Sequence, residues 1–121
     1  MTDHEAVIEL ANQYLRGIYE GDTQALRAVF LPDARVEDPV TGSFRSRTAD
    51  QYVAAVGSRQ SPQAAGESFN MRVQSVQVLG DMAMVTAELR FLGNHFYNVL
   101  SLLRHEDKWR IAHKLFGPPI P

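Results

Sequence analysis

The first half of the chain spaces its apolar residues as helices do. Between residues 4 and 19, apolar side chains recur at intervals of three and four, which predicts an amphipathic helix. Asp22 can cap a second helix over Thr23–Phe30, and a third short helix is predicted over Thr48–Arg59. Each of these helices has an apolar face that needs a partner surface.

From residue 67 onward the apolar positions alternate with a period of two, which is typical of strands. Short turns divide this region into four strands, predicted over residues 69–78, 82–92, 95–104 and 108–116. An extended segment over Ala34–Val40 precedes them, and Thr41–Arg47 is polar and is predicted to be a loop. Helices first and an antiparallel meander afterwards indicate the α+β class.

The predicted sheet is apolar on both faces. In the third strand, apolar side chains point to both faces of the sheet, but the helices can cover only one face. We therefore expect a homodimer formed through the outer sheet face. Strict alternation assigns Trp109, Ile111 and Leu115 to that interface.

The length of 121 residues predicts a single domain over residues 1–121. A net charge of −2 with mixed signs argues against a nucleic-acid partner. The absence of cysteine excludes disulfides and thiolate metal sites, and the four histidines have no ligand-like spacing, so no metal site is expected. No segment is long and apolar enough for a membrane span, and the start of the chain lacks a signal-peptide pattern. We expect a cytoplasmic protein with no membrane partner.

Two parts of the chain resemble known families. The run that contains Tyr14, Gly21-Asp22 and Val36-Glu37-Asp38-Pro39-Val40 resembles the start of bacterial ketosteroid isomerase, a member of the nuclear transport factor 2-like superfamily. The last strands, over residues 100–116, are similar to the lumazine-binding branch of that superfamily, and SnoaL-like polyketide cyclases share its fold. The resemblance implies a cone-shaped α+β barrel, in which three N-terminal helices pack on a curved antiparallel sheet around a blind apolar pocket.

The likeness to ketosteroid isomerase also implies site residues. Asp38 matches the general base, and Tyr14 matches the phenol that donates a hydrogen bond to the enolate oxygen. At the position of the second, protonated acid, this chain has Ser101, which is a weaker donor. Because the loss of one such donor typically costs about 2.7–4 kcal/mol of transition-state stabilisation, we expect steroid isomerisation to be inefficient here.

The pocket wall is expected to come from the first helix, the third helix and the strands. By alternation Lys114 shares a face with Phe116, and two orientations stay open for its amine, toward the pocket or toward the rim of the cone. The expected ligand-binding residues are Tyr14, Tyr52, Val85, Ala87, Leu89, Phe91, Lys114 and Phe116.

Three functions are compatible with this sequence. The first is a small-molecule pocket protein that binds an apolar or planar ligand. The second is a cofactor-independent isomerase, cyclase or dehydratase, with Asp38 moving a proton and Tyr14 stabilising charge on oxygen. The third is a non-catalytic dimeric accessory domain. No residue pattern indicates a cofactor.

Overall fold

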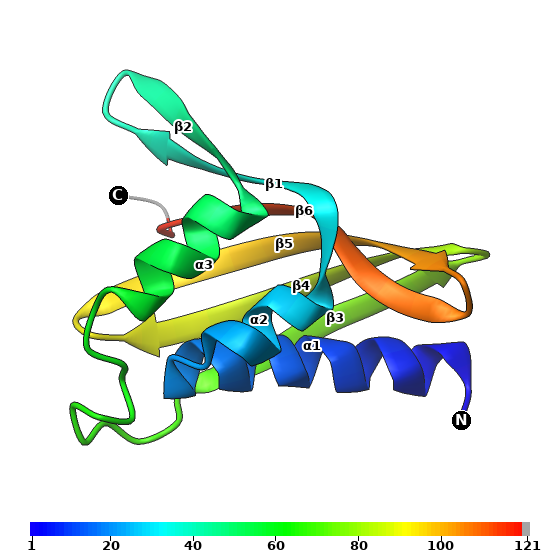
Figure 1. Cartoon of the computed structure of the whole chain (residues 1–121), viewed down its shortest axis with the longest axis horizontal. Coiled ribbons are helices and arrows are strands. Elements are labelled where there is room, and N and C mark those ends of the chain that lie inside the picture. The colour runs from blue at the N-terminus through cyan, green and yellow to red at the C-terminus, as the bar shows by residue number, and fades with distance from the viewer. Residues whose placement is uncertain (120–121) are drawn as a thin grey trace.

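The computed structural model describes residues 1–119 and shows three helices packed on one face of a curved sheet (Figure 1). The helices are α1 (Asp3–Glu20), α2 (Thr23–Val29) and α3 (Ala49–Gly57). The strands are β1 (Phe30–Val40), β2 (Ser43–Thr48), β3 (Met71–Leu79), β4 (Met82–Phe91), β5 (Asn94–His105) and β6 (Lys108–Gly117). The α+β class and the three helices on a curved sheet are confirmed.

The strands form one sheet in the order β2-β1-β6-β5-β4-β3. The four-stranded meander from β3 to β6 is antiparallel, as predicted, and β1 pairs with β2 in the same way. The pairing of β1 with β6 is parallel, so the sheet is mixed rather than wholly antiparallel. This pairing brings residues 30–40, from the first third of the chain, beside the last strand.

Local sequence signals fix the helix ends. Thr2 and Glu5 form a reciprocal capping box at the start of α1, and Gly21 ends that helix with a left-handed φ of 69°. The side chain of Asp22 accepts a hydrogen bond from the backbone of α2, and Thr48 caps α3. The cap at Asp22 matches the sequence prediction, while α3 ends two residues earlier than predicted.

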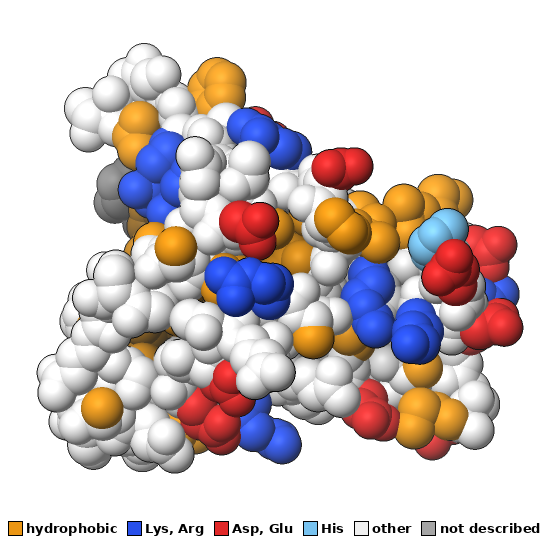
Figure 2. Space-filling view, viewed as in Figure 1, with side chains coloured by type: hydrophobic (Ala, Val, Ile, Leu, Met, Phe, Trp, Pro, Cys, Tyr) orange, Lys and Arg blue, Asp and Glu red, His pale blue; other side chains and the backbone are white. Residues whose placement is uncertain are grey.

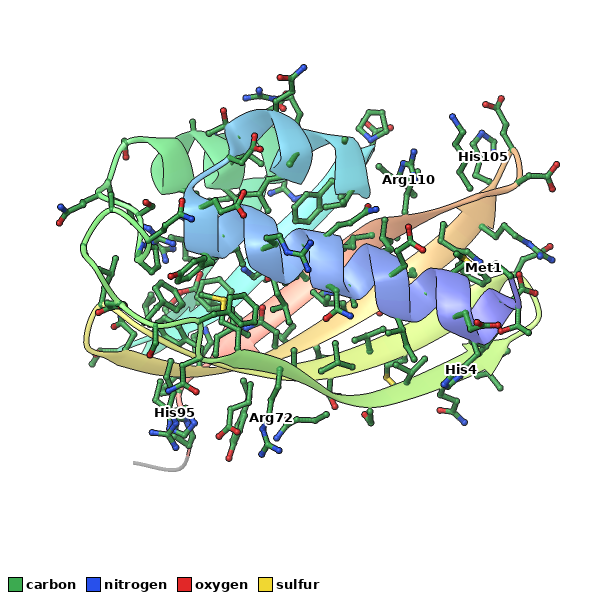
Figure 3. The ribbon with its side chains drawn as sticks, turned by 90° about the horizontal axis from the view of Figure 1, so that it is seen from below. Met1, His4, Arg72, His95, His105 and Arg110 are labelled. Carbon is green, nitrogen blue, oxygen red and sulfur yellow. The ribbon has the colours of Figure 1, made fainter. Side chains whose placement is uncertain are left out.

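The core lies between the helices and the inner face of the sheet. Helix α1 packs mainly on β3, and α3 packs on β1. Seen from below, α1 crosses the strands on one side, whereas Arg72 and His95 project from the other side (Figure 3). The largest fully buried side chains are Tyr14, Leu15, Ile18, Leu26, Leu89, Leu100, Ile111, Val7, Val36, Val53, Val56 and Val85.

The loop predicted over Thr41–Arg47 is instead most of strand β2. It forms a hairpin with β1, in which Val40 pairs with Ser43 and Arg35 pairs with Thr48. Most of its side chains are exposed, and the hairpin projects from the body of the molecule (Figure 1). A strand with two polar faces carries no alternating signal, which explains why the sequence pattern indicated a loop.

A β-bulge in β6 changes which side chains face inward. Ser101 pairs with His113 and Leu102 pairs with Ile111, so Ala112 has no partner on β5. Because the extra residue resets the alternation, both Ile111 and Lys114 face the helices. The assignment of Trp109 and Ile111 to an outer interface is therefore wrong, because both are in the core, with Trp109 only 5% exposed.

The outer sheet face keeps several exposed apolar side chains, namely Met82, Met84, Tyr97, Leu103 and Leu115. Beside them lies a groove of about 680 Å³ that Phe44, Tyr97, Val99, Leu115 and Pro118 help to line. On the face seen in Figure 2, acidic and basic side chains are interspersed. Within residues 1–119, no helix has the length and apolar character needed to cross a membrane.

Candidate functional site

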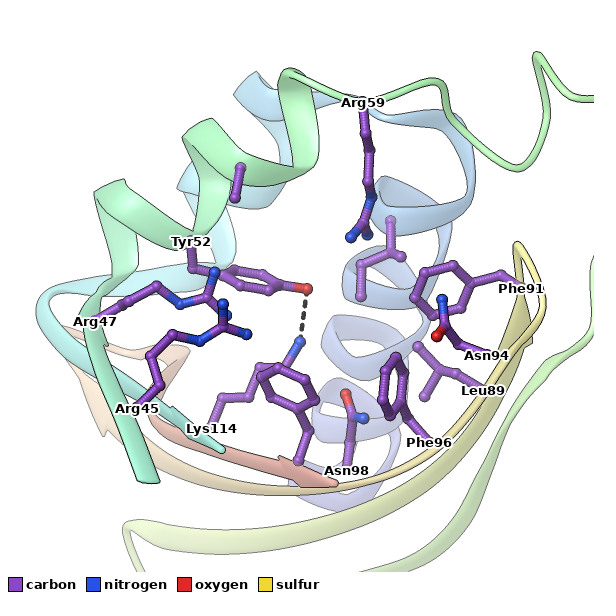
Figure 4. Close-up of a pocket in the computed structure, with 13 residues that line it drawn as sticks. Arg45, Arg47, Tyr52, Arg59, Leu89, Phe91, Asn94, Phe96, Asn98 and Lys114 are labelled. Atoms are coloured by element: carbon purple, nitrogen blue, oxygen red, sulfur yellow. Dashed lines mark hydrogen bonds between the residues drawn. The ribbon is translucent and has the colours of Figure 1, made fainter. Parts of the chain in front are cut away.

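A cavity of about 260 Å³ lies between α3, the hairpin strand β2 and the inner face of β4, β5 and β6 (Figure 4). Its wall combines aromatic rings with cationic side chains. The lining residues are Ile18, Arg45, Arg47, Tyr52, Ala55, Arg59, Leu89, Phe91, Asn94, Phe96, Asn98, Lys114 and Phe116. Among the described residues 1–119, no Asp or Glu lines this cavity.

The amine of Lys114 is buried within a group of aromatic rings. The side chain is 2% exposed, and its Nζ donates a hydrogen bond of 2.6 Å to the hydroxyl of Tyr52 (Figure 4). Nζ also lies 3.9 Å from the ring centroid of Tyr52, 4.6 Å from that of Phe116 and 5.1 Å from that of Tyr14. The β-bulge thus directs Lys114 into the pocket and not to the rim.

The burial of these groups changes their proton affinities. Desolvation lowers the pKa of Lys114 well below its ordinary value, and the nearby Arg59 and Arg47 lower it further, while Asp38 acts in the opposite direction. Burial raises the pKa of Tyr14 well above its ordinary value and raises that of Tyr52 to about 12. Both phenols are therefore neutral near neutral pH.

Three arginines line the cavity, two from β2 and one from the residues that follow α3. Arg45 and Arg47 are two residues apart on β2, so they share one face of that strand, and Arg59 follows α3 (Figure 4). The side chain of Arg47 is 17% exposed, and its buried Nε has no hydrogen-bond partner among residues 1–119. Sequence reasoning missed all three arginines: Arg45 and Arg47 lie in a segment that had been interpreted as a loop, and Arg59 was the last residue of the predicted third helix.

Asp38 is buried beside the cavity, where it pairs with arginines. Its two carboxylate oxygens each accept a 3.0 Å hydrogen bond from Arg45, and Arg47 lies 3.8 Å away. These contacts supply the opposite charge that a buried carboxylate requires. Asp38 itself lines the outer groove rather than the cavity. This geometry favours a role in holding the arginines, and the role of general base stays a prediction.

Tyr14 lies behind the cavity wall. It is fully buried, and its hydroxyl donates to Oδ1 of Asn98, a residue of β5 that is 1% exposed. Asn98 lines the cavity and Tyr14 does not. Ser101 is exposed and lies three residues further along β5, so it faces the outer side of the sheet. The residue that meets Tyr14 is therefore Asn98, which the sequence did not single out.

The structure brings together five of the residues expected to bind ligand, namely Tyr52, Leu89, Phe91, Lys114 and Phe116. Val85 and Ala87 are buried on the inner face of β4 but lie outside the cavity lining. His95 and His113 bond to Glu88 and Glu37, away from the cavity. In residues 1–119, no cluster of three or more His, Cys, Asp or Glu side chains could hold a metal ion.

The three helices on a curved mixed sheet, with a cavity between them, are the architecture of the nuclear transport factor 2-like class. Comparison with protein families gives a narrower assignment. The model of the family described as "Putative lumazine-binding" matches residues 2–117, and the chain belongs to this family. A search of curated proteins finds no match.

Solved structures share the fold of this chain. A nuclear transport factor 2-like protein of unknown function from Silicibacter pomeroyi DSS-3 is 28% identical, with a TM-score of 0.85 over 98% of this chain and 100% of the other. Another from Shewanella baltica OS155 is 17% identical, with a TM-score of 0.84 over 98% of this chain and 95% of the other. A third from Methylobacillus flagellatus KT is 20% identical, with a TM-score of 0.81 over 98% of this chain and 93% of the other. At these lower identities the last two show the fold alone.

Proposed function

We propose that the protein binds a small planar molecule that carries an anionic group, inside the cavity. The observation that carries this proposal is the convergence of Arg45, Arg47 and Arg59 on a cavity whose lining, within the part of the chain that the structure describes, contains no acidic residue. Asp38 offsets part of this charge from outside the lining. A carboxylate or a similar anion would complete the balance.

The position of Arg47 supports direct contact with the anion. A largely buried guanidinium gains from a nearby negative charge, and the salt bridge of Arg47 with Asp38 is long, at 3.8 Å. Arginine also binds carboxylates through two parallel hydrogen bonds, which fixes the orientation of a planar ligand.

The rest of the cavity suits a flat apolar body. Tyr52, Phe91, Phe96 and Phe116 supply aromatic walls, and Asn98 adds a polar group at one point. A volume of about 260 Å³ is slightly below the range of about 300–1,000 Å³ that drug-sized ligands occupy. We therefore expect a molecule with a single ring or with two fused rings. The description of the family names a lumazine, a bicyclic compound of that size.

A matched pair of probes tests this proposal. The carboxylate 2-naphthoate and its neutral amide 2-naphthamide have nearly the same shape. Their difference in affinity therefore reports how much the negative charge of the ligand contributes to binding. Calorimetry at low salt should show tighter binding of the carboxylate, and added salt should reduce the difference. Equal affinities, or no binding of either probe, would contradict the proposal.

We also propose that two copies pair through the outer sheet face. The exposed Tyr97, Leu103 and Leu115 and the adjoining groove support this arrangement. Phe116 lines both the groove and the cavity, so a second copy on this face would lie directly behind the cavity wall. Sedimentation of the protein and of a variant with a charged outer face tests the pairing.

A further inference from the structure

Lys114 has an unusual environment for a lysine. Its amine is buried at the cavity wall, and within residues 1–119 no carboxylate forms a salt bridge with it. Lysine is almost never fully buried without an ionic partner, because removing the ammonium from water is costly. An amine kept in this position at such a cost suggests a function that uses the nitrogen.

Two opposing effects act on the charge of this amine. The rings of Tyr14, Tyr52 and Phe116 attract an ammonium through their electron-rich faces. Burial and the charges of Arg47 and Arg59 oppose it, and together they lower the pKa of Lys114 strongly. Desolvation of the buried amine is the largest cause of the lowered pKa, and the charges of Arg59 and Arg47 act in the same direction. The neutral amine is the nucleophilic form of lysine.

We propose that Lys114 forms an imine with a small aldehyde or ketone that also carries a carboxylate. This inference rests on the proposed function, because the arginines would hold the carboxylate while the amine reaches the carbonyl. The amine lines the same cavity as Arg45, Arg47 and Arg59, so one small ligand can meet both groups.

The reaction balances without any oxidant or cofactor. The lone pair of Nζ attacks the carbonyl carbon and forms the C–N bond, while the carbonyl oxygen takes up a proton and the nitrogen loses one, which gives a carbinolamine. Loss of the hydroxyl group with a further nitrogen proton then releases water and leaves the C=N bond. Tyr52, whose hydroxyl is 2.6 Å from Nζ and stays protonated because its pKa is about 12, is placed to pass protons between the two atoms.

Reductive trapping tests the proposal on the intact protein. The probe is 4-carboxybenzaldehyde, a planar aldehyde with a carboxylate, and borohydride reduces any imine to a stable secondary amine that peptide mass spectrometry can locate. The chain contains only two lysines, so the exposed Lys108 is an internal control, together with the N-terminal amine of Met1. An exposed lysine has only about one neutral amine in a thousand near neutral pH.

We expect the adduct on Lys114 to exceed that on Lys108 by about tenfold or more near neutral pH, since each unit by which the pKa falls raises the neutral fraction about tenfold. Benzaldehyde, which lacks the carboxylate, should label Lys114 more weakly. Lys114→Met should remove the main adduct, and Lys108→Arg should leave it unchanged. Tyr52→Phe should slow trapping at Lys114 and leave trapping at Lys108 unaltered.

The controls separate failure of this inference from failure of the proposed function. If 2-naphthoate binds but Lys114 is labelled no faster than Lys108, the imine proposal is wrong and the anion pocket stands. If the adduct forms equally well with and without a carboxylate, the arginines do not guide the probe and the proposal as stated is also wrong. Preferential labelling of Lys114 in the wild-type chain supports it even where the Lys114→Met variant does not fold.

Discussion

The replacement of Arg47 by methionine is the most direct test of the anion site. Of the two arginines on β2, Arg47 is the more buried, with a side chain 17% exposed against 48% for Arg45. Methionine keeps much of the aliphatic volume and removes the charge. We expect Arg47→Met to weaken the binding of 2-naphthoate and to leave the binding of 2-naphthamide nearly unchanged.

The magnitude follows from the burial of the guanidinium. Two unit charges 4 Å apart attract by about 1 kcal/mol in water and by about 4 kcal/mol at the effective dielectric of a protein surface. Arg47 is largely buried, but the pairing with Asp38 at 3.8 Å reduces its pull on a ligand. We therefore expect a loss near 2 kcal/mol, which is about a thirtyfold rise in Kd.

Calorimetric titration of both probes into both proteins measures this difference. The matched control is Arg72→Met, because Arg72 is an exposed arginine that pairs with Glu88 on the side of the sheet opposite α1 (Figure 3). It removes the same charge from the protein but not from the cavity. An equal effect of the two substitutions on naphthoate, or a parallel loss of naphthamide binding, would refute the reasoning.

Four further predictions concern single residues. Tyr14→Phe leaves the buried Oδ1 of Asn98 without its donor and should cost about 1–3 kcal/mol of unfolding free energy in urea titrations, with naphthoate affinity retained; a loss of affinity alone would contradict the structural role. The lowered pKa of Lys114 means that the unfolded state binds the extra proton, so unfolding free energy should rise with pH up to the unfolded pKa of about 10.4. Lys114→Met should reduce this rise in denaturation series from neutral to alkaline pH, and an unchanged slope would count against a neutral amine. Sedimentation should give twice 13.6 kDa for the wild type and a monomer for Leu115→Glu, and a wild-type monomer would exclude the proposed pairing. If Asp38 is the base that the resemblance implies, Asp38→Asn should abolish exchange of the proton beside a bound ketone, and persistence of that exchange would remove this role.

The sequence specifies the scaffold well, because the scaffold depends on local signals. Thr2, Asp22 and Thr48 are capping residues whose side chains bond to the backbone within three positions, so the chain itself shows where each helix begins. The long strands β4 and β5 have one face toward the core, and this burial enforces the alternation that predicts them.

The site was harder to predict, because it depends on pairing between distant segments. Arg45 and Arg47 are in a strand with no apolar face, and only its pairing with β1 gives these arginines a shared direction. The resemblance placed Ser101 beside Tyr14, but the residue in that place is Asn98. A shift of three residues along a strand moves a side chain to the opposite face of the sheet. The bulge at Ala112 has no sequence signal of its own.

The bulge has a consequence for how members of this family can diverge. It divides β6 into a half that ends with Trp109 and Ile111 in the core and a half whose Lys114 and Phe116 meet the ligand space. Substitutions beyond the bulge can change what the cavity accepts while the buried residues before it continue to drive folding. Selection can therefore alter the lining of the cavity and preserve stability within one strand.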